Sequence, residues 1–173
     1  MRLSLIIAVG AAAAACQPNT SRPGFTPLPE AAGTEVRLPV RDATRYLADA
    51  LRADSIPIRR VMLRDGYLES NWFYSKSKRA ATGRRPLGLG VVRVRAWADP
   101  ARPGSSQLSV ETSYRPMVDP SLPPRELDRQ VPRNHPIGMQ VEAALKQLVD
   151  RYGGPPPPAA QPAAAQAAPE DDQ

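Results

Sequence analysis

Proline placement is the sequence feature that most limits where this chain can fold. The chain has 21 prolines in 173 residues, more than twice the share of about 5% that is usual in proteins. Five lie in 17–39, six in 116–136 and six in 153–173. Because proline lacks an amide hydrogen and fixes φ, helix interiors and central strands avoid it. We therefore expect the regular structure to lie mainly within 40–115 and 137–152.

Two segments have the apolar spacing of an amphipathic helix. In 42–53, apolar residues recur at i, i+3, i+4, i+7 and i+8, and Asp42 is the expected N-cap. A second helical pattern begins at Pro136, which suits the first helical position, and ends before Gly153, which suits the position after the last turn. We expect one helix near each end of the folded part.

Alternating polarity between the two helices predicts strands. In 58–74, Asp65 and Gly66 separate two strand-like runs, which favours a hairpin with a two-residue turn and Leu63 opposite Leu68. A single bent strand over the same residues is the alternative.

A second hairpin has the clearer pattern. Residues 87–99 and 107–115 both alternate, and the turn "PARPGSS" lies between them. Its polar face carries Arg93 and Arg95, and Glu111 is expected beside one of them.

The expected element order is α-β-β-β-β-α over 40–152. An antiparallel meander of about four strands needs a layer over its apolar face, and the two helices are the candidates, so we predict a two-layer α+β sandwich with both helices on one face. Residues 16–39 show neither a period of 2 nor one of 3.6 and are expected to form a flexible tether of roughly 25 Å. The Pro/Ala-rich tail, 153–173, is expected to be disordered.

The amino-terminal sequence is typical of a targeting signal. Arg2 precedes 13 uncharged residues, 3–15, which are too few to span a bilayer, and the three residues before Cys16 are small. The "AAAC" stretch resembles the lipobox of bacterial lipoproteins, although Ala13 stands where leucine is commoner. The resemblance implies that 1–15 is a signal peptide and that Cys16 carries diacylglycerol and a further acyl chain such as palmitate. The alternative is an ordinary secretory signal with an incidental cysteine.

The residue after the cysteine bears on the membrane that would hold it. By analogy with Gram-negative lipoproteins, Gln17 in place of aspartate favours the outer membrane, with the domain facing the periplasm. At least two acyl chains would give stable anchoring.

Catalytic patterns are weak in this sequence. The only histidine, His135, lies at the entrance to the second helix and is expected to be a cap or turn residue rather than a base. The chain has no G-x-S-x-G, no HExxH and no glycine-rich phosphate loop. The lone cysteine excludes an internal disulfide and a CxxC metal site. We expect no catalytic residue, cofactor or metal, and an envelope hydrolase is the second alternative.

Basic residues offer the clearest candidate contact surface. The loop 75–86 contains five, and two more are expected on an open sheet face; the seven are Lys76, Lys78, Arg79, Arg84, Arg85, Arg93 and Arg95. They form either a solvated arginine-rich surface or a site for an anionic lipid, lipopolysaccharide or an acidic partner. Nucleic acid is not an expected partner outside the cytoplasm. Among the nearby aromatic residues, Trp72 is the one expected in the core.

The lipobox, tether and small α+β domain together resemble envelope lipoproteins. The likeness is to BamC-type domains of the outer-membrane barrel-assembly machinery and to lipopolysaccharide-assembly lipoproteins, in topology over 40–152 only. It implies a membrane-anchored interaction or assembly module of an envelope complex. Binding of lipopolysaccharide or another anionic glycolipid is the alternative function.

Overall fold

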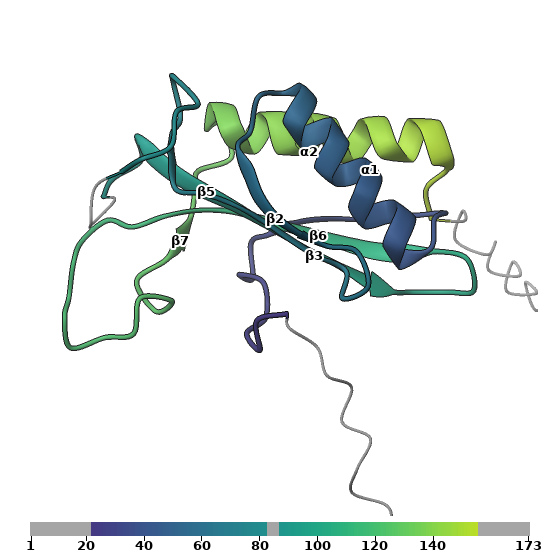
Figure 1. Ribbon diagram of the computed structural model, residues 1–173, viewed down its shortest axis with the longest axis horizontal. Helices are drawn as coiled ribbons and strands as arrows, with labels where there is room; N and C mark the ends of the chain where they lie inside the picture. The colour runs from purple at the N-terminus through teal and green to yellow at the C-terminus, as the bar shows by residue number, and fades with distance from the viewer. Residues whose placement is uncertain (1–21, 83–86, 156–173) are drawn as a thin grey trace, which may run out of the picture.

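The computed structural model describes residues 22–82 and 87–155, which form one antiparallel sheet with two helices. The elements are β1 (Ala32–Val36), α1 (Val40–Ala53), β2 (Ile58–Met62), β3 (Tyr67–Ser70), β4 (Phe73–Tyr74), β5 (Val91–Pro100), β6 (Ser106–Tyr114), β7 (Arg129–Gln130) and α2 (Pro136–Tyr152). The sheet order is β1-β6-β5-β3-β2, with β4 paired to β5 and β7 paired to β6. Both helices lie on the same face (Figure 1). The predicted α+β class with helices packed on a sheet is therefore confirmed.

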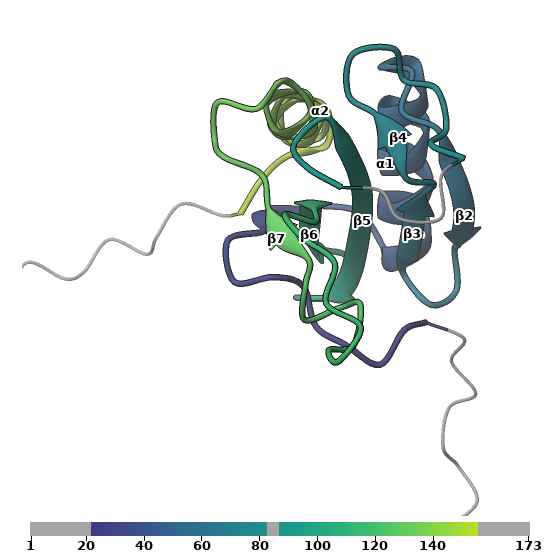
Figure 2. The same cartoon turned by 90° about the vertical axis from the view of Figure 1, so that its left-hand side faces the viewer.

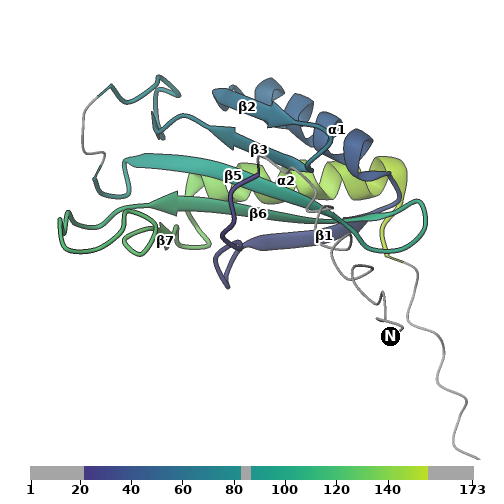
Figure 3. The ribbon, with the colours of Figure 1, turned by 60° about the horizontal axis from the view of Figure 1, so that its bottom comes forward.

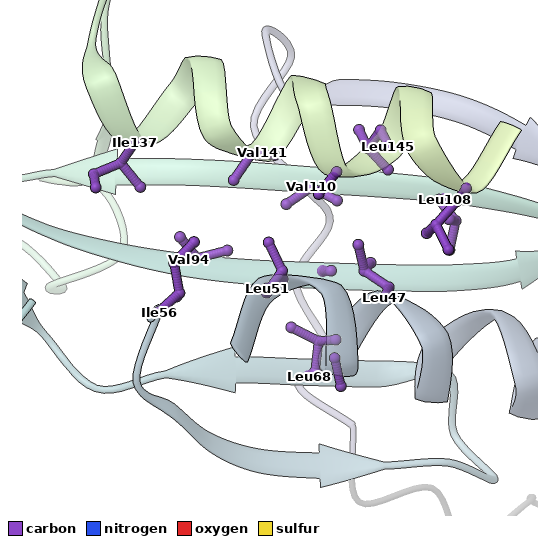
Figure 4. Close-up of a cluster of buried hydrophobic side chains, with 14 of the residues drawn as sticks. Leu47, Leu51, Ile56, Leu68, Val94, Leu108, Val110, Ile137, Val141 and Leu145 are labelled. Carbon is purple, nitrogen blue, oxygen red and sulfur yellow. The ribbon is translucent and has the colours of Figure 1, made fainter. Parts of the chain in front are cut away.

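The core fills the space between the helices and the sheet. Leu47 and Leu51 of α1 and Leu145 of α2 are almost fully buried against β3, β5 and β6, whose Val94 and Val110 point toward them (Figure 4). These positions are the ones that helical and alternating spacing assigned to the interior. The predicted pairing of the second hairpin is also present, since Arg95 lies opposite Glu111 in the β5–β6 register.

Helix α1 begins earlier than predicted. Pro39 is the N-cap residue and offers no capping side chain, so the expected cap by Asp42 is wrong. Asp42 lies in the first turn instead, where a carboxylate interacts favourably with the helix dipole, and it pairs with Arg45 at 3.0 Å.

The first hairpin has a different register from the predicted one. Val61, not Leu63, pairs with Leu68, and residues 63–66 form a four-residue turn. The turn is fixed by β5: the Ala98 amide donates to the Gly66 carbonyl at 2.7 Å, and Gly66 has a φ of 61°. Contact with a third strand therefore determined the register, and the dipeptide alone did not show it.

The expected tether, 16–39, is wrong over its described part. Residues 32–36 form β1, which pairs with the edge of β6 from Ala32 opposite Val110 to Val36 opposite Ser106, and Val36 is fully buried. Strand β1 forms because its backbone pairs with the edge of β6, which would otherwise be free. Its sequence is short and alternates little, so the pattern alone does not predict a strand. The sequence predicts about four strands, whereas the described residues contain seven.

The second face of the sheet is covered as well. Residues 22–31, which we call the strap, cross it on the side away from the helices, and the loop 115–128 lies on the same side at the end beside β7 (Figures 1 and 3). Arg22 of the strap pairs with Asp99 at 2.6 Å, and the Leu28 amide donates to Glu111 at 3.1 Å. This face was expected to be open.

Neither described helix is long and apolar enough to cross a bilayer. The predicted signal peptide 1–15, Cys16 and the tail from 156 lie outside the described residues. The described start of that tail is tied to the domain, since the Arg37 amide donates to the Gly153 carbonyl at 3.1 Å.

Candidate functional site

The predicted basic loop follows β4 and precedes β5, and its Lys78 contacts α2. Lys76 and Arg79 are exposed, whereas Lys78 is half-buried with a φ of 58° and its ammonium donates to the Gln140 side chain. Burial lowers the pKa of Lys78 from its ordinary value, and the nearby Asp54 carboxylate opposes that shift. Two predicted members of this group, Arg84 and Arg85, lie outside the described residues.

The two arginines of β5 do not belong to an exposed basic surface. Arg95 is buried and bonds Glu111 Oε1 at 2.8 Å and Asp128 Oδ2 at 3.2 Å. Arg93 bonds Asp128 Oδ2 at 3.0 Å, and only 15% of its side chain is exposed. The expectation that Arg93 and Arg95 line an open basic face is therefore wrong, because the strap and the 115–128 loop cover that face. The predicted pairing with Glu111 is confirmed.

These contacts belong to a buried charge network with two carboxylates at its centre. The side chains of Asp128 and Glu111 are both 0% exposed. Asp128 also accepts a hydrogen bond from Arg115 Nε at 2.7 Å. Glu111 accepts two more hydrogen bonds, one from each terminal nitrogen of Arg125, at 2.6 and 2.8 Å. The network joins β5 and β6 to the loop 115–128. Within the described residues, the network contains four arginines and two carboxylates, so its net charge is positive.

Aromatic rings cover the network's cations. The guanidinium groups of Arg95 and Arg125 lie 5.0 and 4.5 Å from the ring centre of Phe25, which also meets Trp97 edge-on at 6.0 Å. Stacking of this kind stabilises a partly desolvated cation. Phe25 is therefore the anchor residue of the strap.

Trp72 has the same role at the other end of the network. Arg93 and Arg115 lie 4.5 and 4.9 Å from its ring centre, and the side chain is half-buried. The expectation that Trp72 belongs to the core is wrong: its neighbour Phe73 is fully buried there instead. Because residues alternate in an extended segment, only one of the two can face the helices.

His135 caps α2. Its Nδ1 accepts from the Ile137 amide at 3.2 Å, and its Nε2 lies 3.1 Å from the Leu89 carbonyl oxygen. The tautomer that fits both contacts has its proton on Nε2. The cap predicted from the sequence is confirmed, and both ring nitrogens are engaged.

The exposed large apolar side chains gather at one end of the domain. They are Tyr74, Leu87, Leu89, Met117, Val118, Leu122 and Met139. All lie in the segments 74–82, 87–90, 115–122 and 133–139, which we call the loop end; Figure 2 views the domain from this end. The predicted basic residues Lys76, Lys78 and Arg79 lie at the same end. Sequence spacing gave no sign of this gathering, because the four segments meet only in the folded chain.

A hollow of about 940 Å³ lies beside this end. It runs between α2, β6 and β7 and is lined by Thr112, Val141 and Arg129 among others. The Thr112 hydroxyl is buried and has no hydrogen-bond partner in the structure. No group of three His, Cys, Asp or Glu side chains able to hold a metal ion occurs among residues 22–82 and 87–155.

The residues of the charge network that sequence reasoning missed come from a proline-rich stretch. Arg125 and Asp128 lie in "PPRELDRQ", which has no strand or helix period. The available signal was an excess of arginines on one face of the predicted hairpin, with too few carboxylates on the same strands to pair with them.

Comparisons with known proteins add no family. No family model, no curated protein and no solved structure matches this chain.

Proposed function

We propose that this chain is a bacterial envelope lipoprotein, lipidated on Cys16, whose domain acts as an interaction and assembly module and not as an enzyme. The proposed location is the outer membrane, with the domain facing the periplasm. The lipobox-like sequence "AAAC" before Gln17 supports the anchor.

The observation that carries the proposal is the position of the strap. Arg22, six residues after Cys16, is already held on the domain by its ion pair with Asp99. Six extended residues reach at most about 20 Å. A lipidated Cys16 would therefore hold the domain close to the bilayer, with the end of the sheet at which β5 finishes nearest to it.

The test is the fate of Cys16 in a bacterium that processes lipoproteins. We expect the wild-type chain to fractionate with membranes, to incorporate an alkyne-labelled fatty acid and to lose 1–15. Cys16→Ser should leave the domain folded but release it from the membrane or leave the precursor uncleaved. A wild-type chain that is soluble and carries no lipid would show that the proposed anchor is wrong.

The assembly role has its own experiment. Crosslinking in intact envelopes, followed by purification of the lipidated chain, should recover the same protein repeatedly and lose it in the Cys16→Ser chain. Failure to recover any specific protein would count against an assembly module while leaving the anchor intact.

A second candidate function is binding of lipopolysaccharide or another anionic envelope glycolipid. It is favoured by the exposed Lys76 and Arg79 of the basic loop. Because Arg93 and Arg95 are committed to buried carboxylates, charge reversal belongs at the exposed pair. Salt-sensitive glycolipid binding that is unchanged in Lys76→Glu/Arg79→Glu would exclude this role for the loop.

The envelope hydrolase receives no support from the described residues. His135 caps α2 through Nδ1 and contacts the Leu89 carbonyl through Nε2, so it is not placed as a general base.

A further inference from the structure

The loop end combines apolar side chains with a surplus of cations. Seven large apolar side chains that are 37–59% exposed occur in the described residues, and all seven lie there. The same four segments contain five cations, of which Lys76, Arg79 and Arg133 are exposed, and one carboxylate, Asp119. Arg115 is paired with the buried Asp128, and Lys78 donates to Gln140. Exposed apolar groups gathered in one place mark an interaction site, because a soluble surface ordinarily spreads them.

The loop end is held in a fixed arrangement. The Gly88 amide donates to the Arg115 carbonyl at 2.6 Å, which joins the segment before β5 to the segment after β6. The Ser75 amide donates to the Gly90 carbonyl at 2.9 Å, and His135 contacts the Leu89 carbonyl. Backbone hydrogen bonds thus connect segments far apart in the sequence, so the apolar side chains are presented together without further ordering.

We propose that the loop end is a second membrane contact, in which these apolar side chains enter the headgroup region of a bilayer rich in anionic phospholipid. The proposal rests on the proposed function, since it assumes the bilayer to which Cys16 is anchored. Interfacial binding of this kind combines burial of apolar area with attraction of Lys and Arg to anionic headgroups. The contact would fix the orientation of the domain, which a single anchor leaves free.

Two observations favour a bilayer over a protein partner. The apolar side chains stand on separate segments with cations between them, a mixture suited to a lipid interface, whereas the core of a protein interface is depleted of charge. The strap and the loop carrying Met117, Val118 and Leu122 also lie on the same side of the sheet (Figures 1 and 3). The Arg22–Asp99 pair lies where β5 ends, whereas the loop end lies where β5 begins, so the anchor and the loop end would hold the same side of the sheet at its two ends.

The first experiment uses the chain's lack of any other cysteine. With Cys16 blocked by lipid, Leu122→Cys introduces a unique thiol for a nitroxide label, and Lys146→Cys on the exposed side of α2 is the matched control. The lipidated chains are reconstituted into vesicles of phosphatidylglycerol and phosphatidylcholine. We expect the label at 122 to gain accessibility to oxygen and lose accessibility to a water-soluble nickel reagent, while the label at 146 does not. Phosphatidylcholine alone should reduce the difference.

The second experiment is independent of lipidation. In the Cys16→Ser chain, Lys76→Glu/Arg79→Glu should weaken partitioning onto phosphatidylglycerol vesicles about 30-fold. The control, Arg41→Glu/Arg64→Glu, reverses two exposed arginines at the opposite end of the sheet and should change partitioning far less.

The outcomes separate this proposal from the proposed function. If Cys16 carried no lipid, the proposed anchor would be wrong. The vesicle partitioning of the Cys16→Ser chain would still test the membrane contact at the loop end. Labels at 122 and 146 that are equally exposed to water, or charge reversals that act equally at both ends, would overturn the membrane contact. The membrane contact would also be overturned if position 122 were shielded only in whole envelopes and crosslinked there to one protein. The loop end would then be a protein interface.

Discussion

Removal of the Asp128 charge tests whether the buried network holds the second face of the sheet together. Asp128→Asn keeps the shape of the side chain but withdraws the carboxylate that faces Arg93, Arg95 and Arg115 at 2.7–3.2 Å. The amide retains one acceptor oxygen and turns a donor toward cations that are themselves donors. The surplus of positive charge in the network rises by one.

The expected cost follows from the burial of the group. Breaking a buried ion pair by removing one partner costs about 3–5 kcal/mol, because the remaining charges are left without compensation. Asp128 is 0% exposed and faces three arginines that are 6–18% exposed, so the upper half of that range applies. For a domain of this size, each kcal/mol lowers the melting temperature by about 4 °C, which predicts a loss of about 15–20 °C.

The assay is unfolding followed by circular dichroism, with heat and with urea, and the control is Asp49→Asn. Asp49 pairs with Arg52 at 3.2 Å, but both side chains are more than half exposed, so its loss should cost well under 1 kcal/mol. A further variant, Asp128→Asn/Arg115→Met, should recover part of the stability by removing one uncompensated charge. If Asp128→Asn unfolds within 1 kcal/mol of the wild-type chain, the carboxylate does not organise this face and the reasoning is refuted.

The remaining predictions concern the turn, the pH profile and the helix cap. Gly66→Ala should destabilise the domain by several kcal/mol in a urea titration, because φ is 61° and a Cβ would lie 2.1 Å from the Ala98 carbonyl oxygen. The control is Gly104→Ala, where φ is 78° and a Cβ would meet nothing within 4 Å, and it should cost about 1 kcal/mol. Burial, and then the Glu69 carboxylate that accepts from its hydroxyl, raise the pKa of Tyr67 above 10.0. The unfolded chain then releases this proton first, so stability should fall as the pH rises above about 10, and Tyr67→Phe should lessen that fall; an unchanged slope between pH 9 and 11 would contradict the shift. His135→Ala should cost about 1 kcal/mol through loss of the α2 cap, and a destabilisation below a few tenths would show that the cap contributes little.

The elements that the sequence predicted best are those whose pattern reflects burial on one side. Both helices and the β5–β6 hairpin repeat apolar residues at the period of their own backbone, so a single segment carries the information. The cap of α2 by His135 and its end at Gly153 were predicted for the same reason: capping depends on neighbours within three residues.

The missed elements depend on partners far away in the chain. Strand β1 exists because the edge of β6 was free, and the register of β3 follows from β5, which lies some 30 residues on. Neither contact leaves a period in the sequence of β1 or of the turn at 63–66. Prediction from local pattern therefore found fewer strands than the sheet contains and gave the wrong turn.

For the candidate site, the sequence identified charge but not exposure. Lys76 and Arg79 are exposed as expected, whereas Arg93 and Arg95 lie under the strap and the loop with Asp128. Alternation shows which face of a strand a side chain takes, but not whether another segment crosses that face.

By itself, the sequence determined the class of the domain, its two helices, its central hairpin and the candidate anchor at Cys16, because these depend on local spacing and on short motifs. Only the tertiary structure decided that the second sheet face is closed by a charge network, and that the exposed apolar side chains meet at one end. Both features join segments separated by tens of residues, and the energies that bring them together, desolvation and ion pairing, depend on distance in space and not on distance along the chain.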